Sequence, residues 1–363
     1  MTKKLWFQTG VAILLTLVII RMFMEVKGIF SPLLIIGQTI FLPLLIGGVL
    51  FYLSRPLLTL LESIKFPRWA SILSVFVIIG LIGWLFYALI GPPLTKQVNT
   101  LVKNTPEIVK EVEQFTKNVL SLEDSLPDKF QDTFQVTVND ATGKINDIAV
   151  SAGSFLIKFI QNVFQGIFLL VLVPFFLVYM LKDHEKFAPF VSGFVKGEKK
   201  TWIRKTLADI DDTLRSYIQG QLFVSFLVGL MLLIGYFIID LQYALLLAIF
   251  GMMMNVIPFL GPYISVVPAI IIALIQEPKL AIYVAIIMLV AQQIESNFIT
   301  PNVMGKSLDI HPLTVITVIL AAGNIAGLWG IILAIPTYAV IKVILKNIYA
   351  HRKGIKDAAT KSV

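Results

Sequence analysis

The chain contains no cysteine, and only 14% of its 363 residues are charged. Without cysteine it can form neither disulfide bonds nor thiolate metal sites. Its three histidines, His184, His311 and His351, are far apart in the sequence and show no ligand spacing. A glycine-rich phosphate loop and a nucleophile with a nearby base are also missing. We therefore expect neither an enzyme nor an ATP-driven pump, and we expect no cofactor and no metal.

Apolar residues are what the sequence has in excess. They make up 57% of the chain, and the mean hydropathy is +0.86. Soluble domains are about half apolar and about a quarter charged, so this composition indicates a multi-pass membrane protein. The net charge of +8 comes from lysines and arginines that lie beside the apolar runs. It is better explained by membrane topology than by nucleic-acid binding, which we do not expect.

The apolar runs predict an all-α protein with about eight membrane spans. The first span lacks a cleavage site of small residues and is followed by Arg21, so it is expected to stay uncleaved. The third is expected to end at Pro92-Pro93. The predicted spans and apolar segments lie at about 5–24, 31–53, 69–91, 151–181, 217–239, 241–275, 280–299 and 311–348.

The loops predict the orientation of the chain. Residues 182–216 hold eight basic and six acidic groups, whereas residues 92–150 hold six lysines and nine carboxylates. Basic residues near spans favour the cytoplasm, so both termini are expected inside. The predicted organisation is spans 1 to 3 (1–91), an extracytoplasmic helical segment (92–150), span 4 (151–181), a cytoplasmic amphipathic helix (182–216), C-terminal spans with broken helices (217–348) and a cytoplasmic tail (349–363).

Two segments outside the spans carry apolar stripes at helical spacing. The outer segment predicts two helices separated near Leu126-Pro127, and residues 203–218 predict one more. An apolar stripe needs a surface to pack on. That surface is either the same protomer and the lipid headgroups, or another subunit. The stripes are Ile108, Val112, Phe115, Val119 and Leu122; Phe130, Phe134, Val138, Ile145 and Ile148; and Ile203, Leu207, Ile210, Leu214 and Ile218.

Residues 255–270, NVIPFLGPYISVVPAI, interrupt a long apolar run. Pro258, Gly261 and Pro262 fall within five residues, and proline removes a backbone donor from a helix. In lipid, unpaired backbone groups survive only inside protein or beside a wet cavity. The motif therefore predicts two half-helices or a re-entrant hairpin.

A second interruption is predicted at residues 321–330, AAGNIAGLWG, and a third at 38–48. Gly323, Gly327 and Gly330 weaken the helix and are candidate hinges, while Asn324 places a polar group at depth. Paired interruptions in two halves of a membrane protein indicate a substrate site near mid-membrane. The alternative is kinked helices that pack closely through glycine.

The densest polar patch near a span is AQQIESNFITPN, residues 291–302, which Pro301 is expected to end. Gln292, Glu295 and Ser296 share one helical face, and Gln293 and Asn297 occupy the next. A carboxylate within a span usually faces a cavity or a cation. Glu295 could therefore take up a proton or attract a sodium ion. Alternatively, it lies at the helix end in headgroup water, paired with a lysine.

Several stretches resemble the autoinducer-2 exporter family of bacterial membrane permeases, over nearly the full length. The most specific are NVIPFLGPYISVVPAIIIAL, QQIESNFITPNVMGKSLDIHPLTVI and GLWGIILAIPTYAVIK; FLPLLIGGVLFYLSRPLLTLLE and FFLVYMLKDHEK add to them. The resemblance implies about eight helices, a homo-oligomer, taken as a pentamer, and export of small hydrophilic molecules such as autoinducer-2. Similar proteins are also described as sodium(lithium)/proton antiporters. The matching motif positions are Pro258, Gly261, Pro262, Glu295, Asn297, Pro301, His311, Pro312 and Pro336.

These observations predict a secondary transporter in the bacterial cytoplasmic membrane, whose partners are the lipid bilayer, further copies of the chain, and a small polar solute or cation. Glu295 is the candidate for ion or proton coupling. One alternative is an antiporter on the same fold, and another is a scaffold or sensor that transports nothing. The predicted substrate path is Asn255, Pro258, Gly261, Pro262, Gln292, Gln293, Asn297 and Asn324.

Overall fold

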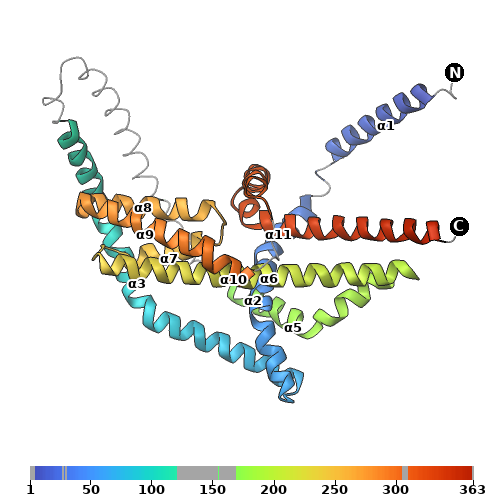
Figure 1. Cartoon of the computed structure of the whole chain (residues 1–363), viewed down its shortest axis with the longest axis horizontal. Helices are drawn as coiled ribbons and strands as arrows, with labels where there is room; N and C mark the ends of the chain where they lie inside the picture. The colour runs from blue at the N-terminus through green and yellow to red at the C-terminus, as the bar shows by residue number, and fades with distance from the viewer. Residues whose placement is uncertain are drawn as a thin grey trace. The chain divides into compact units, whose positions relative to one another are not determined.

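The structure, a computed structural model, describes residues 5–26, 28, 31–120, 154, 169–304 and 310–361 (Figure 1). Every regular element in these residues is a helix, as the composition predicts. The helices are α1 (Leu5–Val26), α2 (Ser31–Ser63), α3 (Arg68–Leu120), α5 (Leu169–Gly193), α6 (Glu198–Ile238), α7 (Ala244–Met254), α8 (Leu260–Gln276), α9 (Pro278–Ile294), the π-turn η4 (Glu295–Ile299), α10 (Thr300–Met304) and α11 (Pro312–Lys361).

Five of the described helices are long and apolar enough to cross a membrane. They are Ile35–Ser63, Arg68–Asn104, Glu198–Ile238, Pro278–Met304 and Pro312–Arg352. A hydrocarbon core of about 30 Å needs about 20 helical residues. Helix α7, with 11 residues, rises only about 16 Å and cannot cross alone. The prediction of an all-helical protein with several membrane-spanning helices is thus confirmed for the described part of the chain.

The chain divides into two compact units, and the first consists of Met1–Phe51 and Ile167–Leu181. Within it, α2 packs on α5 through two adjacent glycines. A Cβ at Gly47 would lie 3.1 Å from the Cβ of Phe176, and Gly48 faces the methyl group of Met180. Small residues let helix backbones approach closely in a membrane protein, where burial of apolar surface gives little driving force.

The second unit, Tyr52–Gly166 and Lys182–Val363, is built around α6. Helix α6 contacts α7, α9, α10 and α11, and it lies beside them in Figure 1. The core between them is apolar and tightly filled. Its most deeply buried side chains include Val224, Val228, Leu232, Tyr236, Leu246, Leu247 and Val284.

Helices α7 and α8 form a hairpin in which the start of α7 and the end of α8 lie next to each other. The Gln276 side chain closes its base, because its Nε2 donates to the Asp240 carbonyl and its Oε1 accepts from the Gln242 amide, both at 2.8 Å. Five residues, 255–259, connect the two helices at the tip. Helix α9 then starts at the base and runs back along α8 to bring Glu295 to the level of the tip.

Helix α11 contains a second reversal. Ala326 and Gly327 leave the helical conformation, with Gly327 at φ 58° and ψ −139°. The two limbs pack on each other, since a Cβ at Gly330 would overlap the Ala322 carbonyl and one at Gly323 would lie 2.9 Å from Ile331. Their buried contacts, together with Tyr217 of α6, are Val315, Ile319, Ala334 and Ile335.

Three predicted helix breaks at prolines are wrong. The interruption expected at 38–48 is absent, because α2 continues through Pro43 from Ser31 to Ser63. Helix α3 continues through Pro92-Pro93 to Leu120, because Leu94 and Leu101 beyond them are buried in the core against α7 and α8. Two prolines inside a helix cost about 6 kcal/mol, and burial of the two leucines offsets about 4 kcal/mol of this cost. Thr95 also donates to the Gly91 carbonyl at 2.8 Å. Likewise Pro301 lies inside α10, after η4 has widened the preceding turn.

The inner charged segment also differs from the expectation. The amphipathic stretch from Ile203 and the span from residue 217 form one helix, α6, of 41 residues. Helix α2 runs to Ser63, ten residues beyond the end of the predicted span at 31–53. The predicted second outer helix and its separation near Leu126-Pro127 lie outside the described residues.

Candidate functional site

A cavity of about 280 Å³ lies where the tip of the α7–α8 hairpin meets α6, η4, α10 and the start of α11. It brings together segments that are up to 118 residues apart in the sequence, from Tyr217 to Ile335. Its lining consists of Tyr217, Gln221, Pro258, Phe259, Gln292, Glu295, Ser296, Thr300, Met304, Ile310, Val315 and Ile335.

The hairpin tip is a tight, strained turn. Phe259 adopts φ 64° and ψ −46°, and the Leu260 amide donates to the Pro258 carbonyl at 2.8 Å across it. This is the positive-φ form of the γ-turn, which is rare for any residue with a side chain. Gly261 follows because a Cβ there would overlap the Met254 carbonyl. Strain of this kind persists where the surrounding structure holds it, often at functional sites.

A chain of side-chain amides links the tip to Glu295. Gln221 of α6 donates through Nε2 to the Asn255 carbonyl at 2.7 Å. Asn255, which is 2% exposed, donates through Nδ2 to Glu295 Oε1 at 3.4 Å. Gln292 Nε2 donates to Glu295 Oε2 at 2.7 Å. Both carboxylate oxygens are therefore oriented by amides, and no lysine, arginine or histidine among the described residues forms an ion pair with Glu295.

The π-turn η4 places this carboxylate. Such turns insert one residue into a helix and are frequent at functional sites. Here Glu295 and Ser296 begin the turn, and Thr300 follows it, so all three reach the same cavity. The Ser296 hydroxyl donates to the Gln292 carbonyl at 2.8 Å, which partly replaces the helical bond that the wider turn disturbs.

The predicted site residues fall into three groups. Pro258, Gln292 and Glu295 line the cavity. Asn255, Gly261 and Pro262 are buried beside or behind the tip. The remaining residues lie elsewhere: Gln293 and Asn297 are exposed and bond to each other at 2.8 Å, Asn324 is exposed on α11, and Gly323, Gly327 and Gly330 form the second reversal.

Some of the residues that line the cavity were not predicted from the sequence. Tyr217 and Gln221 come from α6, and Phe259 and Thr300 flank predicted residues without having been chosen. The stretch YIQGQLF, residues 217–223, did carry a signal, because two glutamines there precede an otherwise apolar span. In the described residues no three histidine, cysteine, aspartate or glutamate side chains gather to hold a metal.

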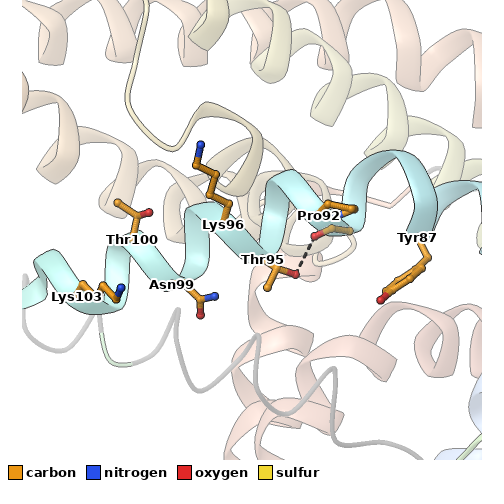
Figure 2. A pocket seen from close by; sticks show the side chains of 8 residues that line it. Tyr87, Pro92, Thr95, Lys96, Asn99, Thr100 and Lys103 are labelled. Carbon is orange, nitrogen blue, oxygen red and sulfur yellow. Dashed lines mark hydrogen bonds between the residues drawn. The ribbon is translucent and has the colours of Figure 1, made fainter.

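A larger hollow of about 560 Å³ lies along α3 (Figure 2). Its described lining comes from this one helix and is mostly exposed, including Lys96, Asn99, Thr100 and Lys103. A binding site usually gathers polar groups from several elements around an apolar pocket. The hollow on α3 lacks that convergence among its described residues, whereas the cavity at the hairpin tip has it.

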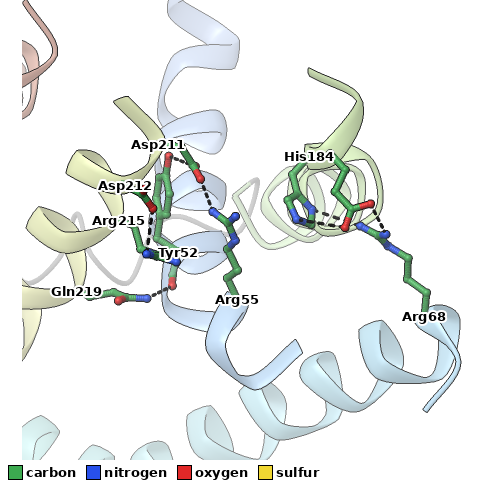
Figure 3. Close-up of polar contacts among 9 residues, drawn as sticks. Tyr52, Arg55, Arg68, His184, Asp211, Asp212, Arg215 and Gln219 are labelled. Carbon is green, nitrogen blue, oxygen red and sulfur yellow. Dashed lines mark hydrogen bonds and ion pairs between the residues drawn. The ribbon is translucent and has the colours of Figure 1, made fainter. Parts of the chain in front are cut away.

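Two polar clusters lie outside the cavity (Figure 3). Arg55 of α2 pairs with Asp211 of α6, Tyr52 donates to Asp211 at 3.1 Å, and Gln219 donates to the Tyr52 carbonyl at 2.6 Å. Separately, Arg68 donates to Glu185 at 2.9 Å, and this hydrogen bond lowers the pKa of the Glu185 carboxyl. Both clusters join helices through charged groups. None of their residues lines the cavity, where Glu295 is bonded to side-chain amides.

The geometry defines a helical protein with several helices long and apolar enough to span a membrane and a cavity of mixed polar and apolar lining, and comparison with known proteins agrees. A profile described as AI-2E family transporter matches residues 11–350. The chain therefore belongs to this family, as its motifs predict, and is a membrane-embedded member of a transporter family.

Individual relatives match over similar lengths. YueF of Bacillus subtilis (strain 168) is 35% identical over 358 residues, covering 95% of this chain and 94% of that protein. YrrI of the same organism is 32% identical, covering 94% and 95%. PerM of Escherichia coli (strain K12) is 24% identical, covering 84% and 86%. The first two are described as candidate transport proteins and the third as a candidate permease.

Proposed function

We propose that the protein is a secondary transporter that exports small polar molecules, such as autoinducer-2, across the bacterial cytoplasmic membrane. The observation that carries this proposal is the cavity at the α7–α8 tip, which is lined by a carboxylate, two side-chain amides and three hydroxyl groups. Such groups replace the hydration of a polar solute. The family match and the relatives described as transport proteins support the same class.

The proposal includes a topology of about eight spans with cytoplasmic termini. In it, the α7–α8 hairpin enters the membrane and leaves on the same side, because its base is closed by Gln276 and α7 is too short to cross. Re-entrant helices at membrane depth are tolerated where they line a cavity. The tip would then lie beside the solute path, with Pro258 in contact with the path and Asn255 buried behind it.

A sodium(lithium)/proton antiporter on the same fold is a second candidate, favoured by one observation. Glu295 is a half-buried carboxylate in the cavity, and none of the described basic residues is paired with it. A carboxylate in that situation can exchange a proton for a cation.

Flux measurements on the purified chain in proteoliposomes separate these candidates. Vesicles loaded with labelled autoinducer-2 are followed for efflux, and vesicles with a sodium gradient are followed for proton movement. The proposal expects solute efflux that Glu295→Gln slows, with proton movement no faster than in empty vesicles. Sodium-driven proton movement that Glu295→Gln abolishes would instead establish the antiporter.

Glu277→Gln is the matched control, because Glu277 precedes α9 at the far end from the cavity and pairs with the exposed Lys279. It should leave both fluxes unchanged. Vesicles that move neither solute nor ions above the empty background would contradict both candidates.

A further inference from the structure

The cavity at the hairpin tip has two chemically different walls. Six of its twelve lining side chains are polar and six are apolar, so a polar solute that also carries an apolar part matches both walls. The polar side comes from α6, α9, η4 and α10 and consists of Tyr217, Gln221, Gln292, Glu295, Ser296 and Thr300. The apolar side comes mainly from the tip and α11 and consists of Pro258, Phe259, Met304, Ile310, Val315 and Ile335.

The polar wall is richer in acceptors than in donors. The amide nitrogens of Gln221 and Gln292 each already use one of their two N–H groups, in hydrogen bonds to the Asn255 backbone carbonyl and to Glu295. Their amide oxygens cannot donate, and neither can the Glu295 carboxylate. Glu295 is also the only described lining residue with a formal charge at neutral pH. A ligand with several N–H donors and a positive charge complements this wall.

Phe259 adds a second attraction for a cation. Its ring lines the cavity from the centre of the strained γ-turn, and the Phe259 side chain is 47% exposed. A simple apolar contact would not need a side chain at a positive φ, which glycine adopts without cost. The face of an aromatic ring attracts an ammonium group within about 6 Å. The turn therefore places the Phe259 ring, whose face can attract a cation, in the same cavity as the Glu295 carboxylate.

The size of the cavity argues against a bare inorganic ion. A cavity of about 280 Å³ has room for more than one water, and a single sodium ion would leave most of that space and the apolar wall unused. We infer that the cavity binds a small amphiphilic organic cation, a primary ammonium group on a short apolar chain. The ammonium group lies against Glu295 and Phe259, and the chain lies against Ile310, Val315 and Ile335. The inference rests on the proposed function in assigning this cavity to the transported solute.

The test measures binding to the full chain in lipid nanodiscs by isothermal titration calorimetry. The probes are n-butylammonium chloride, 1-butanol as a neutral molecule of the same shape, and sodium chloride at equal ionic strength. Butylammonium should bind about tenfold more tightly than 1-butanol, and sodium should not displace it at equal concentration.

Two variants identify the groups that select the cation. Glu295→Gln should weaken butylammonium binding about tenfold and leave 1-butanol binding unchanged, while Glu277→Gln should change neither. Phe259→Leu keeps an apolar side chain on the turn and should weaken butylammonium binding about fivefold. This second variant retains the carboxylate, so it tests the inference even if Glu295→Gln fails to fold.

Equal binding of butylammonium and 1-butanol, or displacement by sodium at equal concentration, would overturn the inference. The results also distinguish a failure of this inference from a failure of the proposed function. If butylammonium does not bind but autoinducer-2 leaves proteoliposomes, transport stands and the cation site falls. If butylammonium binds in a Glu295-dependent way but no solute moves in proteoliposomes, the cation site stands and transport falls.

Discussion

The chain reverses direction twice in similar ways, at the α7–α8 tip and inside α11, yet the two tips differ in chemistry. Both hairpins depend on a glycine whose missing Cβ lets it touch a backbone carbonyl, Gly261 on Met254 and Gly330 on Ala322. The asparagine of the first tip, Asn255, is buried and hydrogen-bonded to Glu295, and Pro258 and Phe259 of this tip line the cavity. The second ends in apolar side chains, with Ile325 85% exposed.

The two hairpins show that the features needed to reverse the chain differ from the features that form a binding site. Close packing through glycine is shared, so it accounts for the hairpins themselves. The first tip alone adds a buried asparagine that is hydrogen-bonded to a carboxylate on another helix. A polar group buried in an apolar surrounding is costly unless it is satisfied, which makes it a stronger sign of function than the glycines are.

The largest effect is expected from disrupting the close contact between a glycine and a backbone carbonyl that both hairpins share. In both Gly261→Ala and Gly330→Ala, the new methyl group overlaps a backbone carbonyl that cannot move without opening the hairpin. Each change should cost more than about 4 kcal/mol, enough to remove folded protein. The measurement is the yield of monodisperse protein after detergent extraction, by size-exclusion chromatography.

Gly80→Ala provides the control, because a Cβ at Gly80 meets nothing within 4 Å. It should give normal yield and slightly higher stability, since alanine favours a helix by about 1 kcal/mol over glycine. A normal yield for either hairpin variant would show that this hairpin does not need the close backbone contact.

The difference between the tips is tested by their two asparagines. Asn255→Ala removes one of the two amides that orient Glu295, and we expect transport to fall about tenfold, as for loss of a hydrogen bond to a charged group. Asn324→Ala removes an exposed side chain that does not line the cavity, and transport should stay within about twofold of wild type. Initial rates in proteoliposomes, normalised to the amount of inserted protein, provide the measurement. Equal losses in both variants would mean that the two tips contribute alike.

Local chemistry in the sequence predicted where these hairpins lie. Pro258 and Gly261 marked the first reversal and Gly327 the second, because both residue types act on the backbone next to them. Helical spacing also placed Gln292 and Glu295 on one face, and the structure brings both into the cavity. Effects that act within about five residues are therefore readable from one sequence.

Contacts between residues far apart in the sequence account for the features that the sequence did not predict. Gln221 meets Asn255 across 34 positions, and no periodicity encodes that contact. Pro92-Pro93 is typical of a helix end, but the burial of Leu94 and Leu101 against α7 and α8 offsets most of the cost of the two prolines. In each case a tertiary contact overrides or adds to the local signal.

A smaller effect is expected from the turn of the second hairpin. Gly327 holds φ 58° and ψ −139°, a region that residues with a side chain rarely adopt, although a Cβ there would meet no neighbour. Gly327→Ala should therefore destabilise the protein by about 2 kcal/mol through backbone strain alone. Thermal unfolding should show a lower midpoint, while amine binding at the first tip stays unchanged. A loss of binding without a loss of stability would place the second reversal in the solute path.

The smallest effect is expected from single cysteines, which report on the two tips without background because the chain has no cysteine of its own. Ser296→Cys places a thiol in the cavity, and Ile325→Cys places one at the exposed second tip. If the first tip binds the solute, saturating butylammonium should slow labelling of Ser296→Cys by a hydrophilic thiol reagent about threefold, by occupying the same space. Ile325→Cys should react at the same rate with and without the amine, because its side chain lies outside the cavity. Labelling followed by mass spectrometry gives both rates, and equal protection at both positions would indicate a global change of conformation in place of a site at the first tip.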